Sequence, residues 1–85
     1  MTSKEEIGRV THYYDKAGVA VVELSSGLRK GDQISIEGAT TNFMQRVESI
    51  QIEHQPIEEA QPGDAIGLKV VERARKGDVL YRITL

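Results

Sequence analysis

The chain is 85 residues long, and 39% of them are hydrophobic. A chain of this length has room for one domain, which buries only about 60% of the surface that the unfolded chain exposes. The chain has no cysteine, which excludes disulfides, thiolate metal sites and cysteine nucleophiles. Its formal net charge of -2 gives it no general attraction for nucleic acid or anionic lipid, so such binding would require a local cationic patch.

The amino terminus is polar and lacks the apolar run of a signal peptide. No later stretch approaches the roughly 20 apolar residues that a helix needs to cross a bilayer. Together with the absence of cysteine, these features predict a cytoplasmic protein that does not bind membranes. We expect a single domain over residues 1–85, in which residues 1–6 form a flexible N-terminus.

The first part of the chain predicts a β-hairpin followed by a third strand. Residues 7–14 and 19–24 are expected strands, and the segment 15–18 between them ends in glycine and is typical of a turn. Residues 33–37 alternate strictly between apolar and polar side chains, which predicts a strand with one face in water. Valine and isoleucine are prominent in the chain, and this composition favours strands over helices.

The segment 43–54 has an apolar pattern that changes phase. Its apolar positions are odd up to Val47 and even from Ile50 onward, which a flat continuous strand cannot satisfy. We therefore expect one strand over this segment, with a β-bulge near Glu48 and Ser49 that restores the register.

The last part of the chain predicts two more strands. Residues 56–60 are the only helix-tolerant stretch, and this stretch is too short for more than one turn. Residues 65–71 and 79–83 are expected strands. Six short strands with turns between them, and no room for crossover helices, favour a closed antiparallel barrel. Closure would also remove the unpaired sheet edges.

The dipeptide Gly-Asp occurs three times, at residues 31–32, 63–64 and 77–78, each time just before an expected strand. Glycine adopts a positive φ without steric cost, and aspartate accepts hydrogen bonds from nearby backbone N–H groups. We therefore interpret the three pairs as one local turn structure used repeatedly, and not as ligand-binding motifs.

The sequence contains no recognisable catalytic, cofactor or metal site. His12 and His54 lie on different expected strands and have no pattern of metal ligands around them. No P-loop is present, because the glycines of segment 27–31 have the wrong spacing and precede a strand. We expect a protein that is not an enzyme and binds no nucleotide.

Positive charge gathers locally in two parts of the chain. Such side chains can converge on one rim and follow a phosphate backbone. The candidate RNA-binding residues are Arg29, Lys30, Lys69, Arg73, Arg75 and Lys76.

Five segments in order resemble the second domain of elongation factor Tu and its relatives. They are residues 8–10, 28–34, 47–52, 60–68 and 75–80. The resemblance implies a six-stranded Greek-key barrel of the translation-factor type. In those factors the barrel follows a GTPase domain and helps to hold aminoacyl-tRNA or to contact the ribosome. The chain has no such GTPase domain, so GTP hydrolysis is not implied.

The hairpin over residues 7–24 is also similar to the small barrel at the carboxyl end of collagenase-like peptidase family proteins. That resemblance implies an accessory domain, and members of that family are associated with RNA modification as well as proteolysis. Two hypotheses follow. The leading one is a translation-factor-like barrel that binds tRNA, rRNA or a ribonucleoprotein. The alternative is a protein-interaction module that docks onto a larger protein through an exposed strand face or an apolar patch around Phe43 and Met44.

Overall fold

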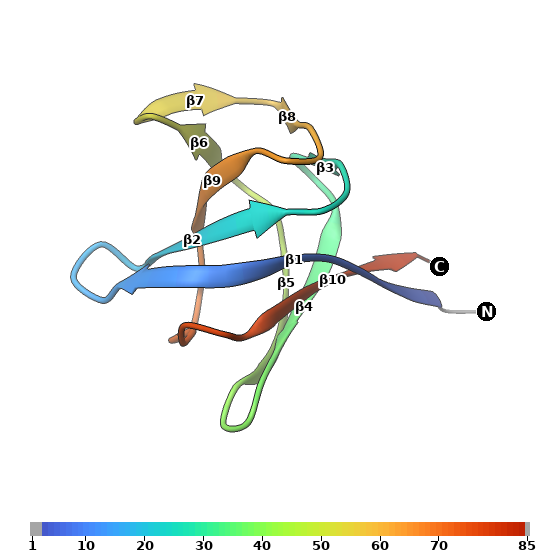
Figure 1. The fold of residues 1–85 in the computed structure, drawn as a ribbon, viewed down its shortest axis with the longest axis vertical. Helices are drawn as coiled ribbons and strands as arrows, with labels where there is room; N and C mark the ends of the chain where they lie inside the picture. The colour runs from blue at the N-terminus through green and yellow to red at the C-terminus, as the bar shows by residue number, and fades with distance from the viewer. Residues whose placement is uncertain (1–2, 85) are drawn as a thin grey trace.

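The structure, a computed structural model, describes residues 3–84 of the chain. These residues form ten β-strands and no helix (Figure 1). In chain order the strands are β1 (Ser3–Tyr14), β2 (Val19–Leu24), β3 (Leu28–Arg29), β4 (Gln33–Glu37), β5 (Asn42–Arg46), β6 (Ile50–Ile52), β7 (Gln55–Ile57), β8 (Glu59–Ala60), β9 (Ala65–Lys69) and β10 (Val79–Thr84). The all-β class predicted from the sequence is confirmed.

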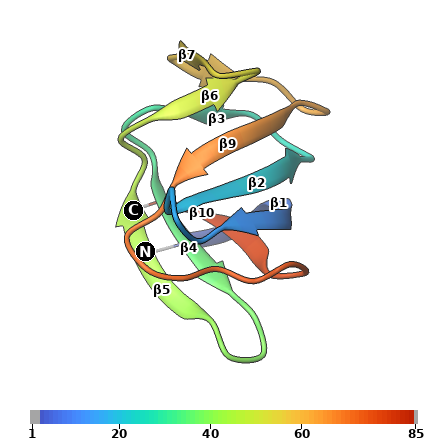
Figure 2. The ribbon, with the colours of Figure 1, turned by 90° about the vertical axis from the view of Figure 1, so that its left-hand side faces the viewer.

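Eight of the strands form one antiparallel sheet in the order β5-β4-β10-β1-β2-β9-β6-β7. The other two, β3 and β8, pair with each other in a small second sheet. The larger sheet is strongly curved and wraps around the hydrophobic interior (Figures 1 and 2). The first strand lies between β10 and β2, so the two ends of the chain meet in one ladder, with Ser3 opposite Thr84.

The expected closed barrel of six strands was wrong in two respects. The described residues form ten strands, because the expected strand 43–54 is divided into β5 and β6, and because β3, β7 and β8 are short additional strands. The larger sheet is also open, since no ladder joins its edge strands β5 and β7 within residues 3–84. Part of the helix-tolerant stretch 56–60 belongs to β7 and β8.

A side chain, and not a ladder, connects β5 to the segment after β9. The Nε2 of Gln45 donates to the carbonyl oxygen of Lys69 at 2.8 Å, and the N–H of Val71 donates to the Oε1 of Gln45 at 2.8 Å. A primary amide carries both a donor and an acceptor, as a peptide group does. The buried Gln45 amide therefore satisfies two backbone groups that a neighbouring strand would otherwise satisfy.

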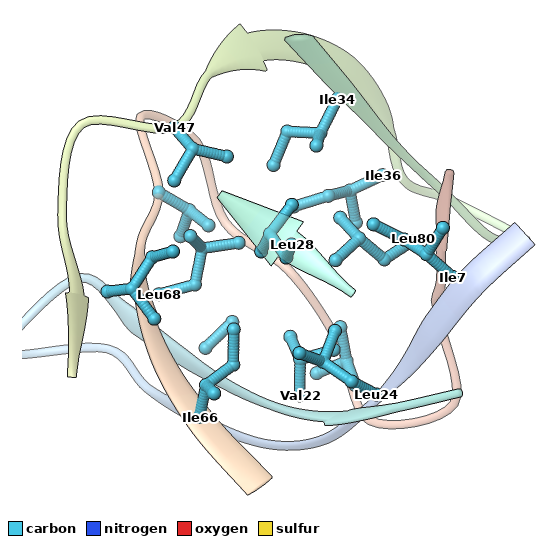
Figure 3. Close-up of a cluster of buried hydrophobic side chains, with 14 of the residues drawn as sticks. Ile7, Val22, Leu24, Leu28, Ile34, Ile36, Val47, Ile66, Leu68 and Leu80 are labelled. Atoms are coloured by element: carbon cyan, nitrogen blue, oxygen red, sulfur yellow. The ribbon is translucent and has the colours of Figure 1, made fainter. Parts of the chain in front are cut away.

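The hydrophobic core is aliphatic and lies inside the curved sheet. Figure 3 shows Leu28, from β3, in the middle of the core side chains. Each fully buried aliphatic side chain of this size stabilises the fold by about 1.5 to 3 kcal/mol. Phe43 is the only buried phenylalanine or tyrosine in the core. The fully buried members are Ile7, Val10, Ala20, Val22, Leu28, Ile34, Ile36, Val47, Ile50, Ala60, Ile66, Leu68, Ala74 and Leu80.

The phase change in segment 43–54 is resolved by ending the strand, and the expected bulge near Glu48 and Ser49 was wrong. The chain leaves the ladder with β4 after Arg46 and enters a different ladder, with β9, at Ile50. Register shifts occur instead in β1, between Glu6 and Gly8 and between Val10 and His12. At Gly8 a Cβ atom would lie 2.8 Å from Val22 Cγ1, so this position requires glycine.

The three Gly-Asp pairs form the same turn, as predicted. The φ angles of Gly31, Gly63 and Gly77 are 99°, 92° and 94°. The Oδ2 atoms of Asp32, Asp64 and Asp78 accept from the N–H groups of Arg29, Gln61 and Arg75 at 3.0, 2.8 and 2.8 Å. The positive φ at the third position and the side-chain acceptor at the fourth define one repeated turn.

Each Gly-Asp turn is also attached to the strand framework by a pair of backbone hydrogen bonds. The glycine N–H donates to the carbonyl of one strand-side residue, and the aspartate carbonyl accepts from the N–H of that same residue. The three anchoring residues are Val47, Leu24 and Val10, all of which are buried. The turns therefore satisfy backbone groups at places where the sheet ladders end.

Residues 3–6 belong to β1 and pair with β10 through Ser3↔Thr84 and the following pairs. The remaining residues of the segment 1–6, which we expected to be flexible, lie outside the described residues.

Within residues 3–84, the structure contains no helix with the length and apolar character needed to span a bilayer.

Candidate functional site

A groove of about 660 Å³ lies over the outer face of the sheet at β2 and β9. Its floor is formed by Val19, Val21, Ala65 and Gly67. Val21 lies opposite Gly67 in the ladder between the two strands. Because glycine has no side chain, the floor is hollow beside Val21. Alternate residues of the same strands face the core, so both faces of β2 are apolar.

Two turns form the walls of the groove. The turn between β1 and β2 contributes Tyr14, Asp15 and Lys16, and the turn between β6 and β7 contributes Glu53 and His54. The Tyr14 side chain is 54% exposed. The centroid of its ring lies 4.2 Å from that of His12, in a tilted arrangement typical of aromatic pairs. The site is therefore an apolar floor with an aromatic and charged rim.

The wall formed by Glu53 and His54 has an unusual backbone. The two residues have φ angles of 51° and 65°, and they are the only non-glycine residues with positive φ in the described part of the chain. A two-residue hairpin turn of this kind normally contains Asn-Gly, because larger side chains are strained there. Strain of this kind tends to occur at binding sites and costs about 1 kcal/mol or more per residue.

This arrangement has the general form of a ligand or protein contact site. A concave apolar floor with a few polar groups at the rim is typical of binding sites. Within residues 3–84, no three histidine, aspartate or glutamate side chains gather in a way that could hold a metal ion. His54 lines the groove, and the ring of His12 lies against Tyr14, which also lines it.

The structure does not bring the six candidate RNA-binding residues together on one rim. Arg29 lies on β3 and pairs with Glu59, with 3.2 Å between Nε and Oε2. Lys30 lies in a shallow hollow that also includes Arg46, Glu48 and Glu58, so its surroundings are of mixed charge. Figures 1 and 2 show β3 at the end of the molecule opposite the connection between β9 and β10.

The other candidate cations lie at the end of β9 and in the connection that follows it. The Nζ of Lys69 donates to the carbonyl oxygen of Ala17 at 2.6 Å and so supports the turn beside the groove. Arg73, Arg75 and Lys76 are exposed in the connection to β10. Within this connection they form a local cationic segment, which Arg29 and Lys30 do not join.

The expected apolar patch around Phe43 and Met44 is reduced to one residue. Phe43 is buried in the core and is 6% exposed, whereas Met44 is 59% exposed on the outer face of β5. The alternation of a strand explains the difference, because successive side chains point to opposite faces.

The clearest electrostatic effect in the fold lies away from the groove, beside the chain ends. The carboxylate of Glu37 accepts a hydrogen bond from Ser35 Oγ at 2.8 Å and from Lys4 Nζ at 3.1 Å. The Ser35 hydrogen bond, followed by the Lys4 contact, lowers the pKa of Glu37 from its usual value. This cluster connects β4 to β1 across β10 and has a structural role.

The sequence analysis missed the groove because its floor carries no catalytic residue types. One signal was available, since Val19 and Val21 are apolar on the face of β2 that would otherwise be polar. The strained turn had no such signal, because nothing in the letters Glu-His predicts two positive φ angles.

The described residues form a small all-β domain with an apolar groove, and the comparisons with known proteins show similarity to part of larger proteins. No family model matches the chain. The chain is 43% identical over 79 residues to an uncharacterized protease of Methanocaldococcus jannaschii, covering 92% of the chain and 19% of that protein. It is 42% identical over 81 residues to a collagenase of Porphyromonas gingivalis, covering 93% of the chain and 22% of the collagenase.

A solved structure shares the fold. The C-terminal domain of a U32 peptidase-type protein from Geobacillus thermoleovorans matches with a TM-score of 0.86 and 26% identity, covering 92% of the chain and 91% of that domain. The chain is therefore similar to a domain of collagenase and U32 peptidase-type proteins. It spans about a fifth of the length of the curated relatives it matches.

A weaker similarity connects the chain to translation factors. The elongation factor 1-alpha of Archaeoglobus fulgidus is 39% identical over 74 residues, which cover 78% of the chain and 17% of that factor. The resemblance to a translation-factor domain is thus supported in part, while the relation to the peptidase-type domain covers more of the chain.

Proposed function

We propose that the chain is a non-catalytic interaction module that works with a larger protein of the collagenase or U32 peptidase type. The observation that carries this proposal is the similarity of nearly the whole chain to about a fifth of such proteins. The solved C-terminal domain with the same fold supports it. In this function the module binds, and the larger protein supplies any chemistry.

The groove is the face that fits this function best. It offers an apolar floor that a protein surface can cover, and its rim carries Tyr14, a residue type enriched at the centres of protein interfaces. Contact through an apolar floor depends little on ionic strength, whereas phosphate contacts weaken steeply with salt. Salt dependence therefore separates this function from RNA binding.

The test is to mix the purified chain with the remainder of a U32 peptidase-type protein from the same organism and to measure the mass of the mixture by sedimentation. We expect a one-to-one complex that persists at high salt after nuclease treatment. Gly67→Val should weaken the complex at least tenfold, because the new side chain fills the groove. A Cβ at Gly67 would lie 3.4 Å from Val19 Cγ1, so the folded state of the variant is checked first by its circular dichroism and its urea denaturation.

A matched control is Gln33→Val, which adds a valine at an exposed position on β4, outside the groove. This variant should bind as the unchanged chain does. Absence of a complex at any salt concentration would contradict the proposal, and equal weakening by both variants would contradict the assignment of the groove.

RNA binding is the second candidate, and the similarity to elongation factor 1-alpha favours it. If this function is correct, Arg73 and Arg75 make phosphate contacts, and exchanging both for glutamate should greatly reduce affinity for tRNA or rRNA. The affinity of the unchanged chain should also fall steeply with salt. Binding of RNA that is unaffected by the double exchange would refute the assignment of these residues.

A further inference from the structure

The wall of the groove that residues 14–17 form lies beyond the end of the sheet. Tyr14 opposite Val19 is the last pair of the ladder between β1 and β2, so residues 15–17 follow it without ladder partners, and all three are exposed. One turn hydrogen bond closes the segment, from the N–H of Gly18 to the carbonyl oxygen of Tyr14 at 2.9 Å. An exposed segment of this kind gains a fixed position only from contacts with the rest of the molecule.

Lys69, the last residue of β9, supplies such a contact. Its Nζ donates to the carbonyl oxygen of Ala17 at 2.6 Å, and within residues 3–84 no other side chain donates a hydrogen bond to the wall segment. No carboxylate in this described part of the chain pairs with the same ammonium group. A hydrogen bond from a charged donor is shorter and stronger than a neutral one. The ammonium group of Lys69 is therefore used within the domain, where it holds the wall.

The register of the strands explains why Lys69 can reach the wall. Val19 lies opposite Lys69 in one ladder and opposite Tyr14 in the other, so the three side chains share the outer face of the sheet. A Cβ at Gly18 would lie only 3.3 Å from the Nζ of Lys69. The missing side chain at Gly18 thus leaves the room in which the ammonium group lies.

A backbone hydrogen bond beside this contact completes the attachment of the turn. The N–H of Val70 donates to the carbonyl oxygen of Gly18 at 3.0 Å, and Val70 is buried. This bond fixes the last residue before β2, whereas the Lys69 bond fixes the residue before that one. Without the Lys69 donor, the segment 15–17 would be held at its two ends alone.

We propose that Lys69 is a positioning residue of the groove. Its ammonium group holds the turn between β1 and β2 where the turn forms a wall, so that a docked protein meets a wall that is already ordered. Ordering the wall before binding removes an entropy cost that would otherwise reduce the affinity. The proposal rests on the function proposed for the groove. It gives Lys69 a role inside the domain, in place of the phosphate contact expected from the sequence.

The first measurement is made on the free, isotope-labelled chain and needs no partner. Lys69→Met keeps a long apolar stem but removes the donor, and Lys76→Met makes the same exchange at an exposed position in the connection to β10. We expect the backbone order parameters of residues 15–17 to fall in Lys69→Met and to stay unchanged in Lys76→Met. The urea midpoints of the two variants should differ little, because both positions are exposed. Unchanged order parameters in Lys69→Met would overturn the proposal.

The second measurement is the affinity of the same variants for the remainder of a U32 peptidase-type protein from the same organism. Lys69→Met should weaken the complex about tenfold, which corresponds to the cost of ordering about one backbone residue. Lys69→Arg keeps a charged donor on a long side chain and should recover most of the affinity. Lys76→Met, the matched control, should bind as the unchanged chain does.

Salt separates positioning from a direct contact between Lys69 and a charged group of the partner. A surface ion pair is screened, so a direct contact predicts that the difference between Lys69→Met and the unchanged chain vanishes at high salt. Positioning predicts that most of the difference persists. A difference that vanishes with salt, equal weakening by Lys76→Met, or no recovery in Lys69→Arg would each overturn the proposal.

The two measurements also separate this proposal from the function on which it rests. If the unchanged chain forms no complex, the function proposed for the groove fails, and the order parameters alone decide whether Lys69 holds the wall. If the complex forms and Lys69→Met binds as tightly as the unchanged chain, the proposed function stands and the role of Lys69 is refuted.

Discussion

Gly77 and His54 both lie in turns and both have a positive φ, of 94° and 65°, but the sequence meets the two backbone requirements differently. At Gly77 the residue type removes the steric cost, and Asp78 supplies an acceptor for the preceding backbone. In the turn that contains His54, two residues with large side chains adopt the same region of φ. The first turn supplies hydrogen-bond partners for nearby backbone groups, whereas the second places two polar side chains at the rim of a groove.

The comparison suggests that stability and binding are located in different regions of this small molecule. The Gly-Asp turns connect to buried residues of the core, such as Val10 and Leu24. The β6–β7 turn forms one wall of the groove and includes the strained residues. Substitutions in the first region should therefore reduce stability, and substitutions in the second should reduce binding without reducing stability.

The largest expected effect is at Asp78. Its side chain is buried, and Asp78→Ala leaves the N–H of Arg75 without its acceptor. We expect the free energy of unfolding to fall by about 2 kcal/mol, as measured by urea denaturation. Asp64→Ala removes the same hydrogen bond from a half-buried position and should cost less. Equal losses of unfolding free energy in the two variants would show that the burial of the aspartate does not determine the cost.

The second effect isolates the backbone conformation. A Cβ at Gly77 would meet no atom within 4 Å, so Gly77→Ala tests only the cost of a positive φ. We expect a loss of about 1 to 2 kcal/mol in the free energy of unfolding. Gly67→Ala is the control, because only ordinary contacts surround its Cβ, and it should change stability by less than about 0.5 kcal/mol.

The third effect has the opposite sign. Replacing Glu53 and His54 by Asn and Gly gives the turn its preferred residues and should raise the free energy of unfolding by about 1 kcal/mol. The same change removes two side chains from the groove wall, so the affinity for a docked protein should fall. A variant that is less stable than the unchanged chain would show that the turn is not strained.

The smallest effect is electrostatic and lies in the region of the chain ends. The pKa of Glu37 is lowered in the folded chain, so its ionised form stabilises the fold at pH values above its usual pKa of 4.5. That contribution is lost as the pH falls through the lower pKa of the folded state. Glu37→Gln should therefore reduce stability slightly at pH 7 and should have no such effect once the pH is well below 4.5.

Thermal unfolding at several pH values checks the Glu37 prediction. The difference in Tm between the unchanged chain and Glu37→Gln should shrink toward acid. The pair with Lys4 is partly exposed, so its effect should also decrease with added salt. A difference that is constant between pH 7 and pH 3 would indicate lost packing in place of lost charge interactions.

Much of the fold could be predicted because local patterns decide it. The alternation in 33–37 and the apolar run in 19–24 identified β4 and β2 with their observed bounds. The Gly-Asp pairs predicted their own turns, since both residue types act on the backbone within four residues. In these places the controlling interactions are close in sequence, so no partner had to be known.

The errors occurred where distant parts of the chain decide the structure. The change of phase between Val47 and Ile50 is compatible with a bulge or with a change of ladder, and only the pairing with β9 selects the second. At the edge of β5, the Gln45 side chain takes the place of a ladder by hydrogen bonding to the backbone of Lys69. The sequence does not reveal this hydrogen bond, because it does not show that Lys69 lies near Gln45. The six candidate cations were grouped from their positions in the sequence. Those positions do not show that β3, which carries Arg29, lies far from the connection between β9 and β10.

The pairing of β1 with β10 has a consequence for how this unit can be combined with other sequences. Because Ser3 and Thr84 face each other across one ladder, any polypeptide joined before and after the domain would enter and leave at neighbouring points. The domain could then be inserted into a loop of a host protein without forcing the two sides of that loop apart. This geometry allows the domain to be transferred between proteins as a unit.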